Sequence, residues 1–382
     1  MHFSPPRLHR AVPLTTAHRT SIEKTLKSSR ASTHQFTARL TLAPTDSVSI
    51  PLTTASLYSD FDAYIDVGFQ GTATYETMIV DSGNNSLIVP RFEDIENLAG
   101  YTIVQKDVRE PWGCKANLVR GPIVLDVDGG GTHSIPDCLF YACTADNTQP
   151  GAETRTANFG TGCLAPKAMA GTLQSVLAFE PTFTCAEFNY APAQQVLGTS
   201  NDPKVSPGSL LTLHKTVPPG YQVFDIVVDP NVQWTSLRVM ALSIGGVQTK
   251  WPGKPYPIAM IDTGGGSVLL SDPTGLLTGT QWPEQEPVPA GWFTQSTQCQ
   301  ATRESLTIQL GDDHGSYTYT VDTSVLSAAV QGRTLVLCQD NQYMFGHPGM
   351  NVGGISALTN SILLDYTNAK VGLKPKPAVA TT

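Results

Sequence analysis

The chain has 382 residues, of which 40% are hydrophobic and 15% charged, so it can build a sizeable core in one large or two medium domains. Its 33 glycines and 28 prolines favour short strands joined by many turns over long helices. The net charge of −8 argues against nucleic acid as the main partner. No apolar run reaches the length of a membrane span, so the sequence predicts no membrane partner either.

Residues 1–48 differ from the rest of the chain and form a basic leader. Residues 1–40 carry seven Lys or Arg against one acid, which gives them a local charge of +6 on an otherwise acidic protein. Such a leader is either a disordered basic tail or a segment that docks on an acidic surface of the same molecule. It lacks the apolar region of a signal peptide. A short helix is expected at "SIEKTLKSS".

The pattern becomes β-like from residue 49 onward. The stretch "DFDAYIDVGF" alternates between polar and apolar residues, and "YETMIV" is an apolar run that ends at Asp81. "GPIVLDVDGGGTHSIPDCLFYA" predicts a hairpin around its glycines, and no helix follows that would make the glycines a phosphate site. A helix is expected within "PKAMAGTLQSVLAF" because its apolar residues recur every four positions.

The second half repeats this order. "GYQVFDIVVDPNVQWTSLRVMALSIGG" predicts two strands, and "SLTIQLGDDHGSYTYTVD" predicts a hairpin whose turn leaves His314 in solvent. "DTSVLSAAVQ" favours a short helix, and "NSILLDYTNAKVGLKPK" favours a closing hairpin. The chain is therefore expected to be mainly β with a few short helices, in two related lobes formed by residues 49–220 and 221–376, with residues 377–382 as a tail.

Each half contains an Asp followed by a hydroxyl residue and a glycine, directly after an apolar strand. These tripeptides are "DSG" (Asp81, Ser82, Gly83) and "DTG" (Asp262, Thr263, Gly264). The glycine permits a tight turn, and the hydroxyl can hydrogen-bond to the other lobe's turn. Two carboxyl groups held about 3 Å apart share a proton and can act as general acid and general base on one water. This chemistry predicts direct hydrolysis of an amide without a covalent intermediate.

The two stretches "VDSGNNSLIVP" and "MIDTGGGSVLLSDP" resemble the catalytic loops of the pepsin-like aspartic proteases, and "FGTGCLAP" and the C-terminal "NSILLDYTNAKVGLKPK" resemble further segments of that family. The resemblance implies a bilobal fold of two β-barrel-like lobes with a central cleft. It implies an aspartic endopeptidase that acts on peptide or protein substrates as a monomer and needs no cofactor or metal. By the same resemblance, Asp81 and Asp262 are the catalytic pair, Ser82 and Thr263 lock the lobes, and Gly83 and Gly264 shape the loops. The basic leader would be a pro-segment.

Four positions depart from the family pattern. The family has a small hydroxyl residue three positions after each acid, where this chain has Asn84 and Gly265. The family carries a Tyr-Gly pair on a flap over the cleft, and the corresponding candidate here is Trp112 with Gly113. Ile88 stands where the family favours an aromatic donor. These departures support an alternative function, a pepsin-fold protein that binds peptides or proteins with little or no turnover.

The chain has seven cysteines, an odd number that leaves at least one unpaired within the chain. The family resemblance implies a disulfide between Cys299 and Cys338, which would favour a secreted protein or another oxidising compartment. Cys138 and Cys143 are a further possible pair. The sequon "NNS" at residues 84–86 falls inside the first catalytic loop and is taken as chance, since a glycan there would block the cleft.

Overall fold

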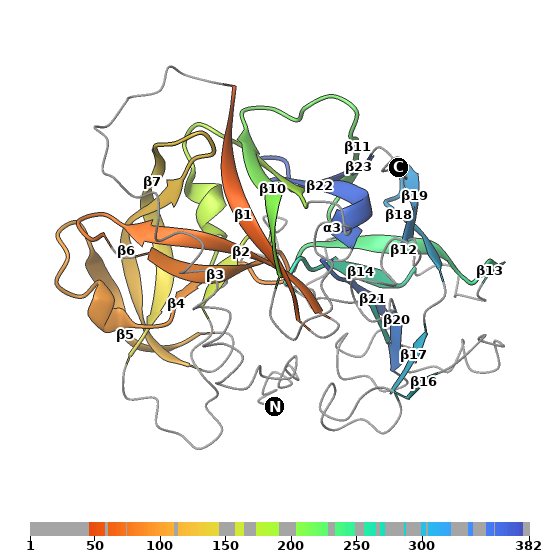
Figure 1. Ribbon diagram of the computed structural model, residues 1–382, viewed down its shortest axis with the longest axis horizontal. Helices are drawn as coiled ribbons and strands as arrows, with labels where there is room; N and C mark the ends of the chain where they lie inside the picture. Colours follow the sequence, from red (N-terminus) through yellow and green to blue (C-terminus); the bar gives the residue numbers. More distant parts are fainter. Residues whose placement is uncertain are drawn as a thin grey trace.

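The fold is that of a computed structural model, which describes residues 46–57, 60–73, 75–110, 114–144, 157–163, 173–190, 204–227, 234–248, 256–264, 268–271, 286–287, 299–302, 305–321, 335–338, 349–354 and 356–376. These residues form two large sheets and three short helical segments. The prediction of a mainly β, bilobal, pepsin-like fold is confirmed. Figure 1 shows the two lobes side by side, with β1, β10 and β22 between them.

The first sheet has 13 strands in the order β11-β23-β22-β9-β10-β1-β2-β3-β8-β4-β7-β6-β5. Their bounds are β1 (Ser47–Leu57), β2 (Asp60–Phe69), β3 (Tyr75–Asp81), β4 (Leu87–Val89), β5 (Thr102–Arg109), β6 (Lys115–Asp126), β7 (Thr132–Cys143), β8 (Asn158–Gly160), β9 (Cys185–Asn189), β10 (Lys204–His214), β11 (Gln222–Asp225), β22 (Asn360–Asp365) and β23 (Lys370–Pro375). Its strands β11, β22 and β23 come from the second half of the chain, so this sheet joins both halves.

The second sheet has ten strands and builds the other lobe. Its order is β16-β17-β20-β15-β21-β14-β12-β18-β19, with β13 paired to β12. The bounds are β12 (Ser236–Ile244), β13 (Val247–Gln248), β14 (Ile258–Ile261), β15 (Val268–Ser271), β16 (Glu286–Pro287), β17 (Cys299–Thr302), β18 (Leu306–Gly311), β19 (Ser316–Val321), β20 (Leu335–Cys338) and β21 (Gly349–Val352). The helical segments are the 3-10 turns η1 (Phe92–Asp94) and η3 (Val176–Phe179) and the α-helix α3 (Ser356–Thr359).

The three predicted hairpins are present. Strands β6 and β7 pair antiparallel around Gly129, Gly130 and Gly131, all of which have positive φ angles that glycine tolerates. Strands β18 and β19 pair across the turn that holds the exposed His314, and β22 pairs with β23. Of the helix predicted within residues 166–179, the described part holds only the 3-10 turn η3, and the helices predicted at residues 21–29 and 322–331 lie outside the described residues.

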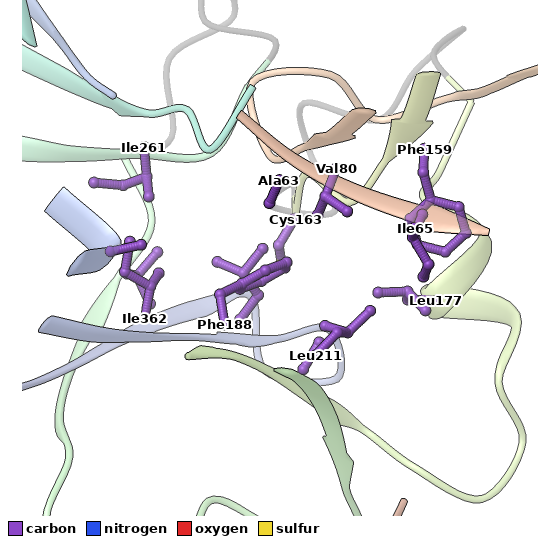
Figure 2. Packing of buried hydrophobic residues seen from close by; sticks show 14 of the residues in the cluster. Ala63, Ile65, Val80, Phe159, Cys163, Leu177, Phe188, Leu211, Ile261 and Ile362 are labelled. Carbon is purple, nitrogen blue, oxygen red and sulfur yellow. The ribbon is translucent and has the colours of Figure 1, made fainter. Parts of the chain in front are cut away.

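One continuous apolar core runs through both sheets and supports the ends of two strands. Val80 of β3 and Ile261 of β14 are both buried, and each directly precedes one of the two acids. Figure 2 shows them facing Phe188 of β9 and Ile362 of β22, the strands of the shared sheet. Burying such side chains contributes about 1.5–3 kcal/mol each. Packing in the core therefore fixes the positions of the C-terminal ends of β3 and β14, next to the two acids.

Among the described residues, no helix is both long and apolar enough to cross a membrane.

Candidate carboxyl-pair site

The two acids sit at equivalent places in the two sheets. Asp81 is the last residue of β3, and Asp262 follows β14 immediately. Asp81 is 6% exposed, whereas Asp262 is half-buried. Each acid turns back on its own loop: the Gly83 N–H donates to Asp81 Oδ1 at 2.8 Å, and the Gly264 N–H donates to Asp262 Oδ1 at 3.0 Å. The tripeptides thus form matching turns, one from each half of the chain.

The hydroxyl residues bind the two turns together. The N–H of Ser82 donates to Thr263 Oγ1, and the N–H of Thr263 donates to Ser82 Oγ, both at 3.0 Å. Each hydroxyl then donates across to the other strand, Ser82 to the carbonyl of Ile261 at 2.8 Å and Thr263 to the carbonyl of Val80 at 3.0 Å. The structure therefore brings together the hydroxyl pair that the sequence predicted as an inter-lobe lock.

The two glycines let the carboxyl groups approach the opposite loop. A Cβ atom built on Gly83 would lie 2.7 Å from Cγ and from Oδ1 of Asp262. A Cβ atom built on Gly264 would lie 2.6 Å from Cγ of Asp81. Real Cβ atoms do not approach other atoms this closely, so each acid occupies the space that a side chain on the other lobe's glycine would need. In both acids, Oδ1 is the carboxyl oxygen nearer to the opposite lobe's glycine.

Two asparagines that the sequence analysis missed donate to the Oδ2 oxygens of the two acids. Asn158 Nδ2 donates to Asp81 Oδ2 at 2.7 Å, and Asn351 Nδ2 donates to Asp262 Oδ2 at 2.5 Å. The two asparagines are equivalent by register. Strand β8 pairs parallel with β3 so that Asn158 lies beside Ile79, two residues before Asp81, and β21 pairs parallel with β14 so that Asn351 lies beside Met260, two residues before Asp262.

A signal for these asparagines exists in the sequence. They begin the tripeptides "NFG" (158–160) and "NVG" (351–353), an Asn-apolar-Gly pattern that occurs once in each half. The glycine is required at least in the first, because a Cβ on Gly160 would lie 2.3 Å from the backbone of Ser86. A search for paired tripeptides around the two acids would have found both asparagines.

Asn84 does not reach the carboxyl group directly. Its Nδ2 donates to Asn158 Oδ1 at 3.0 Å, and its Oδ1 accepts the N–H of Ser86 at 3.0 Å. Asn84 is therefore linked to Asp81 only through Asn158. Asn84 is buried, at 7% exposure, which agrees with taking the sequon there as chance.

Burial raises the pKa of Asp81 well above its ordinary value, and the negative charge of Asp262 raises it further. Hydrogen bonds from Asn158 and from the Gly83 N–H act in the opposite direction, and a hydrogen bond with the Asp262 side chain adds to the rise. Burial and the neighbouring acid therefore favour the protonated form of Asp81 over a wider pH range than that of an ordinary aspartate.

Several predicted site residues lie outside the described part of the chain. These are the flap candidates Trp112 and Gly113, and Gly265 of the second loop. Ile88 is buried in β4, opposite Asn158 of β8 in the sheet register. Within the described residues, no cluster of His, Cys, Asp or Glu is arranged to hold a metal ion.

The possible pair Cys138–Cys143 is wrong, because both thiols are free and buried. They lie five residues apart on the same strand β7, where residues an odd number apart point to opposite faces. Cys299 and Cys338 lie directly opposite each other in the register of the antiparallel strands β17 and β20. Their disulfide stays a prediction.

The fold is shared with known structures of the pepsin-like type. The chain is similar to the crystal structure of basic 7S globulin from soybean, with a TM-score of 0.55 and 13% identity over 87% of this chain and 95% of the globulin. It is also similar to the crystal structure of edgp, with a TM-score of 0.54 and 12% identity over 87% of this chain and 96% of that one. No family model matches the chain. No curated protein matches it either.

These findings correct two expectations. The assignment to the aspartic protease family is wrong, since no family model supports it and the two similar structures above are named as a globulin and as edgp. The prediction of an aspartic endopeptidase is contradicted on the same ground. The physical reason lies in what the motif encodes: the Asp-hydroxyl-Gly turns join the two lobes, and this joint forms whether or not hydrolysis occurs.

Proposed function

We propose that this protein binds an extended peptide or protein segment at the carboxyl pair between its two lobes and does not hydrolyse it. The observation that supports this most is the donor set around the pair. Each of the four carboxyl oxygens already accepts one N–H, from Gly83, Gly264, Asn158 or Asn351. These four hydrogen bonds hold the two carboxyl groups in fixed orientations, so that a peptide can form hydrogen bonds with them.

The two similar structures, which are named as a globulin and as edgp, agree with this proposal. The departures in the sequence also agree with it, because Gly265 has no side chain to support the second acid and the family's Tyr-Gly flap pair is replaced by Trp112-Gly113.

The test combines incubation with binding. The protein is incubated with a denatured protein substrate at several values between about pH 3 and pH 7, where a shared proton would be available, and products are sought by mass spectrometry. Binding is measured by fluorescence anisotropy with a labelled peptide in which a secondary hydroxyl replaces one backbone carbonyl. We expect binding without products.

Asp81→Asn and Asp262→Asn are expected to weaken binding by at least about tenfold, because each loses an ionised acceptor. Asp128→Asn, at an exposed acid in the β6–β7 turn, is the matched control and should bind as the unsubstituted protein does. Products that accumulate in the unsubstituted protein and vanish in Asp81→Asn would contradict the proposal.

A further inference from the structure

Strand β5 (Thr102–Arg109) forms one edge of the 13-stranded sheet. Among the described residues it pairs only with β6, so its other side carries backbone N–H and C=O groups that no strand takes up. None of its eight residues is buried, whereas most residues of β6 are. The strand is therefore open along its outer edge and on both of its faces.

Two large apolar side chains lie exposed next to each other on this strand. Ile103 is 37% exposed and Val104 is 52% exposed, and Val247 of β13 is the one other exposed large apolar residue in the described part of the chain. A register shift falls between Ile103 and Gln105, so Val104 has no partner residue on β6. Exposed aliphatic side chains on an edge strand favour the addition of a further strand.

The same strand carries positive charge on an acidic protein. Lys106 and Arg109 are exposed and take part in none of the ion pairs between described residues, whereas Asp107, the one acid of the strand, is paired with Lys115 at 2.9 Å. The net charge of the whole chain is −8. Two cations without a carboxylate attract an acidic partner and repel a basic one.

These charges decide between the possible occupants of the edge. The leader has a local charge of +6 over residues 1–40, so the cations repel it. A second copy paired through β5 would bring its own Lys106 and Arg109 to the same edge, and like charges across neighbouring strands destabilise pairing. The two register shifts within β5 and its lysine are also features that keep the edges of identical sheets from pairing. An acidic segment of a different protein meets neither obstacle.

We propose that β5 docks an acidic partner protein, which adds an extended segment of alternating acidic and apolar residues to the sheet as a further strand. Backbone hydrogen bonds hold the segment along the edge, its apolar side chains contact Ile103 and Val104, and its carboxylates pair with Lys106 and Arg109. This inference goes beyond the proposed function, because it assigns a second partner to a sheet edge outside the carboxyl pair.

The probe is a labelled peptide as long as β5 in which glutamate and valine alternate, and fluorescence anisotropy measures its affinity for the full chain. We expect saturable binding that weakens as salt is added, because salt screens exposed charges. A matched peptide with lysine in place of glutamate should bind at least about tenfold more weakly. Equal affinity for the two peptides, or binding of neither, would overturn the proposal.

Substitutions in β5 locate the bound peptide. The double variant Lys106→Glu, Arg109→Glu should weaken binding by at least about tenfold, and Val104→Thr should also weaken it. All three positions are exposed, so both proteins should fold. Val247→Thr, at the exposed valine of β13, is the matched control and should bind as the unsubstituted protein does. Unchanged affinity in the double variant would show that β5 is not the docking site.

Strand addition itself is tested in the unsubstituted protein. The bound peptide should slow hydrogen–deuterium exchange of backbone amides in β5, because amides that pair with an added strand are protected. Two N-methylated forms of the peptide, one methylated at the odd and one at the even residues, provide the second measurement. Alternate N–H groups point to opposite sides of a strand, so one form should bind much more tightly than the other. Equal affinity of the two forms would overturn strand addition.

Two further measurements test the choice of site and occupant. Displacement of the acidic peptide by the hydroxyl-containing peptide described above would place it at the carboxyl pair and overturn docking at β5. Dimerisation of the unsubstituted chain that is lost in Val104→Thr, measured by analytical ultracentrifugation, would make a second copy the occupant and overturn the acidic partner. Failure of the hydroxyl-containing peptide to bind would count against the proposed function alone.

Discussion

Ser82 and Thr263, which are 181 positions apart, each donate a backbone N–H to the other's hydroxyl group at 3.0 Å. Both side chains are fully buried. Neither half of the chain can satisfy these four groups alone, because each hydroxyl also donates to a carbonyl of the opposite half. The joint between the lobes is therefore a set of reciprocal hydrogen bonds and not only an apolar contact.

Thr263→Val should destabilise the protein by about 2–5 kcal/mol, because it leaves the Ser82 N–H and the Val80 carbonyl buried without their partner. The shape of the side chain is nearly kept, so little of the loss would come from packing. Urea denaturation followed by tryptophan fluorescence measures the change. Thr318→Val, at an exposed position of β19, is the control and should stay within about 0.5 kcal/mol. A loss no greater than that of the control would show that the lock carries little free energy.

Gly83→Ala and Gly264→Ala should each push the opposite carboxyl group out of place. The added Cβ would lie 2.7 Å from Cγ of Asp262 in the first variant and 2.6 Å from Cγ of Asp81 in the second. We expect a lower melting temperature and loss of peptide binding in both. Gly315→Ala is the matched control, since its Cβ would meet Phe224 at an ordinary 3.8 Å. Retained peptide affinity in either loop variant would mean that the carboxyl pair is not the contact surface.

The sequence was sufficient to locate the acids, their hydroxyl neighbours and the loop glycines. These residues are adjacent in the chain, and each follows an apolar strand whose burial the sequence pattern indicates. Local signals of this kind specify a turn and its capping contacts without knowledge of the rest of the fold. The hairpins at residues 115–143 and 360–375 were predictable for the same reason.

The asparagines were not found because their role depends on strand pairing over a distance. Asn158 reaches Asp81 across 77 positions and Asn351 reaches Asp262 across 89, through parallel pairings. The two Asn-apolar-Gly tripeptides mark these positions, but neither shows by itself with which strand it pairs. The pairing of β22 with β9 of the first half is a long-range pairing of the same kind. The Asp-hydroxyl-Gly motif does not by itself establish enzymatic activity, because the same turns are needed to build the joint between the lobes.

The predicted disulfide between Cys299 and Cys338 can be tested against the other five cysteines, which are free. The two residues face each other across β17 and β20, a register compatible with a bridge. Closing this loop of about 40 residues would stabilise the protein by about 4 kcal/mol in the chain-entropy account. Peptide mapping under non-reducing conditions should find this one bridge, and Cys299→Ser should lower stability only under oxidising conditions. A bridge that involves any other cysteine would contradict the prediction.

Glu187 of β9 should make the shared sheet sensitive to acid. Burial raises its pKa, but a 2.8 Å contact with His214, the nearby Tyr221 hydroxyl and the charge of Lys374 outweigh burial and lower the pKa from 4.5 to about 2. The folded state therefore favours the ionised carboxylate. Between about pH 4.5 and pH 2 the unfolded chain binds more protons than the folded one, so stability is full above this window and falls as the pH falls through it.

The loss across this window should amount to about 3 kcal/mol in the unsubstituted protein, since each pKa unit corresponds to about 1.4 kcal/mol. Glu187→Gln should remove this part of the pH dependence and be less stable than the unsubstituted protein at neutral pH, because it loses the contact between a carboxylate and His214. Urea denaturation at a series of pH values measures both effects, with Glu96→Gln at an exposed acid as the control. A Glu187→Gln protein that loses stability towards acid as steeply as the unsubstituted one would place the acid-sensitive contact elsewhere in the fold.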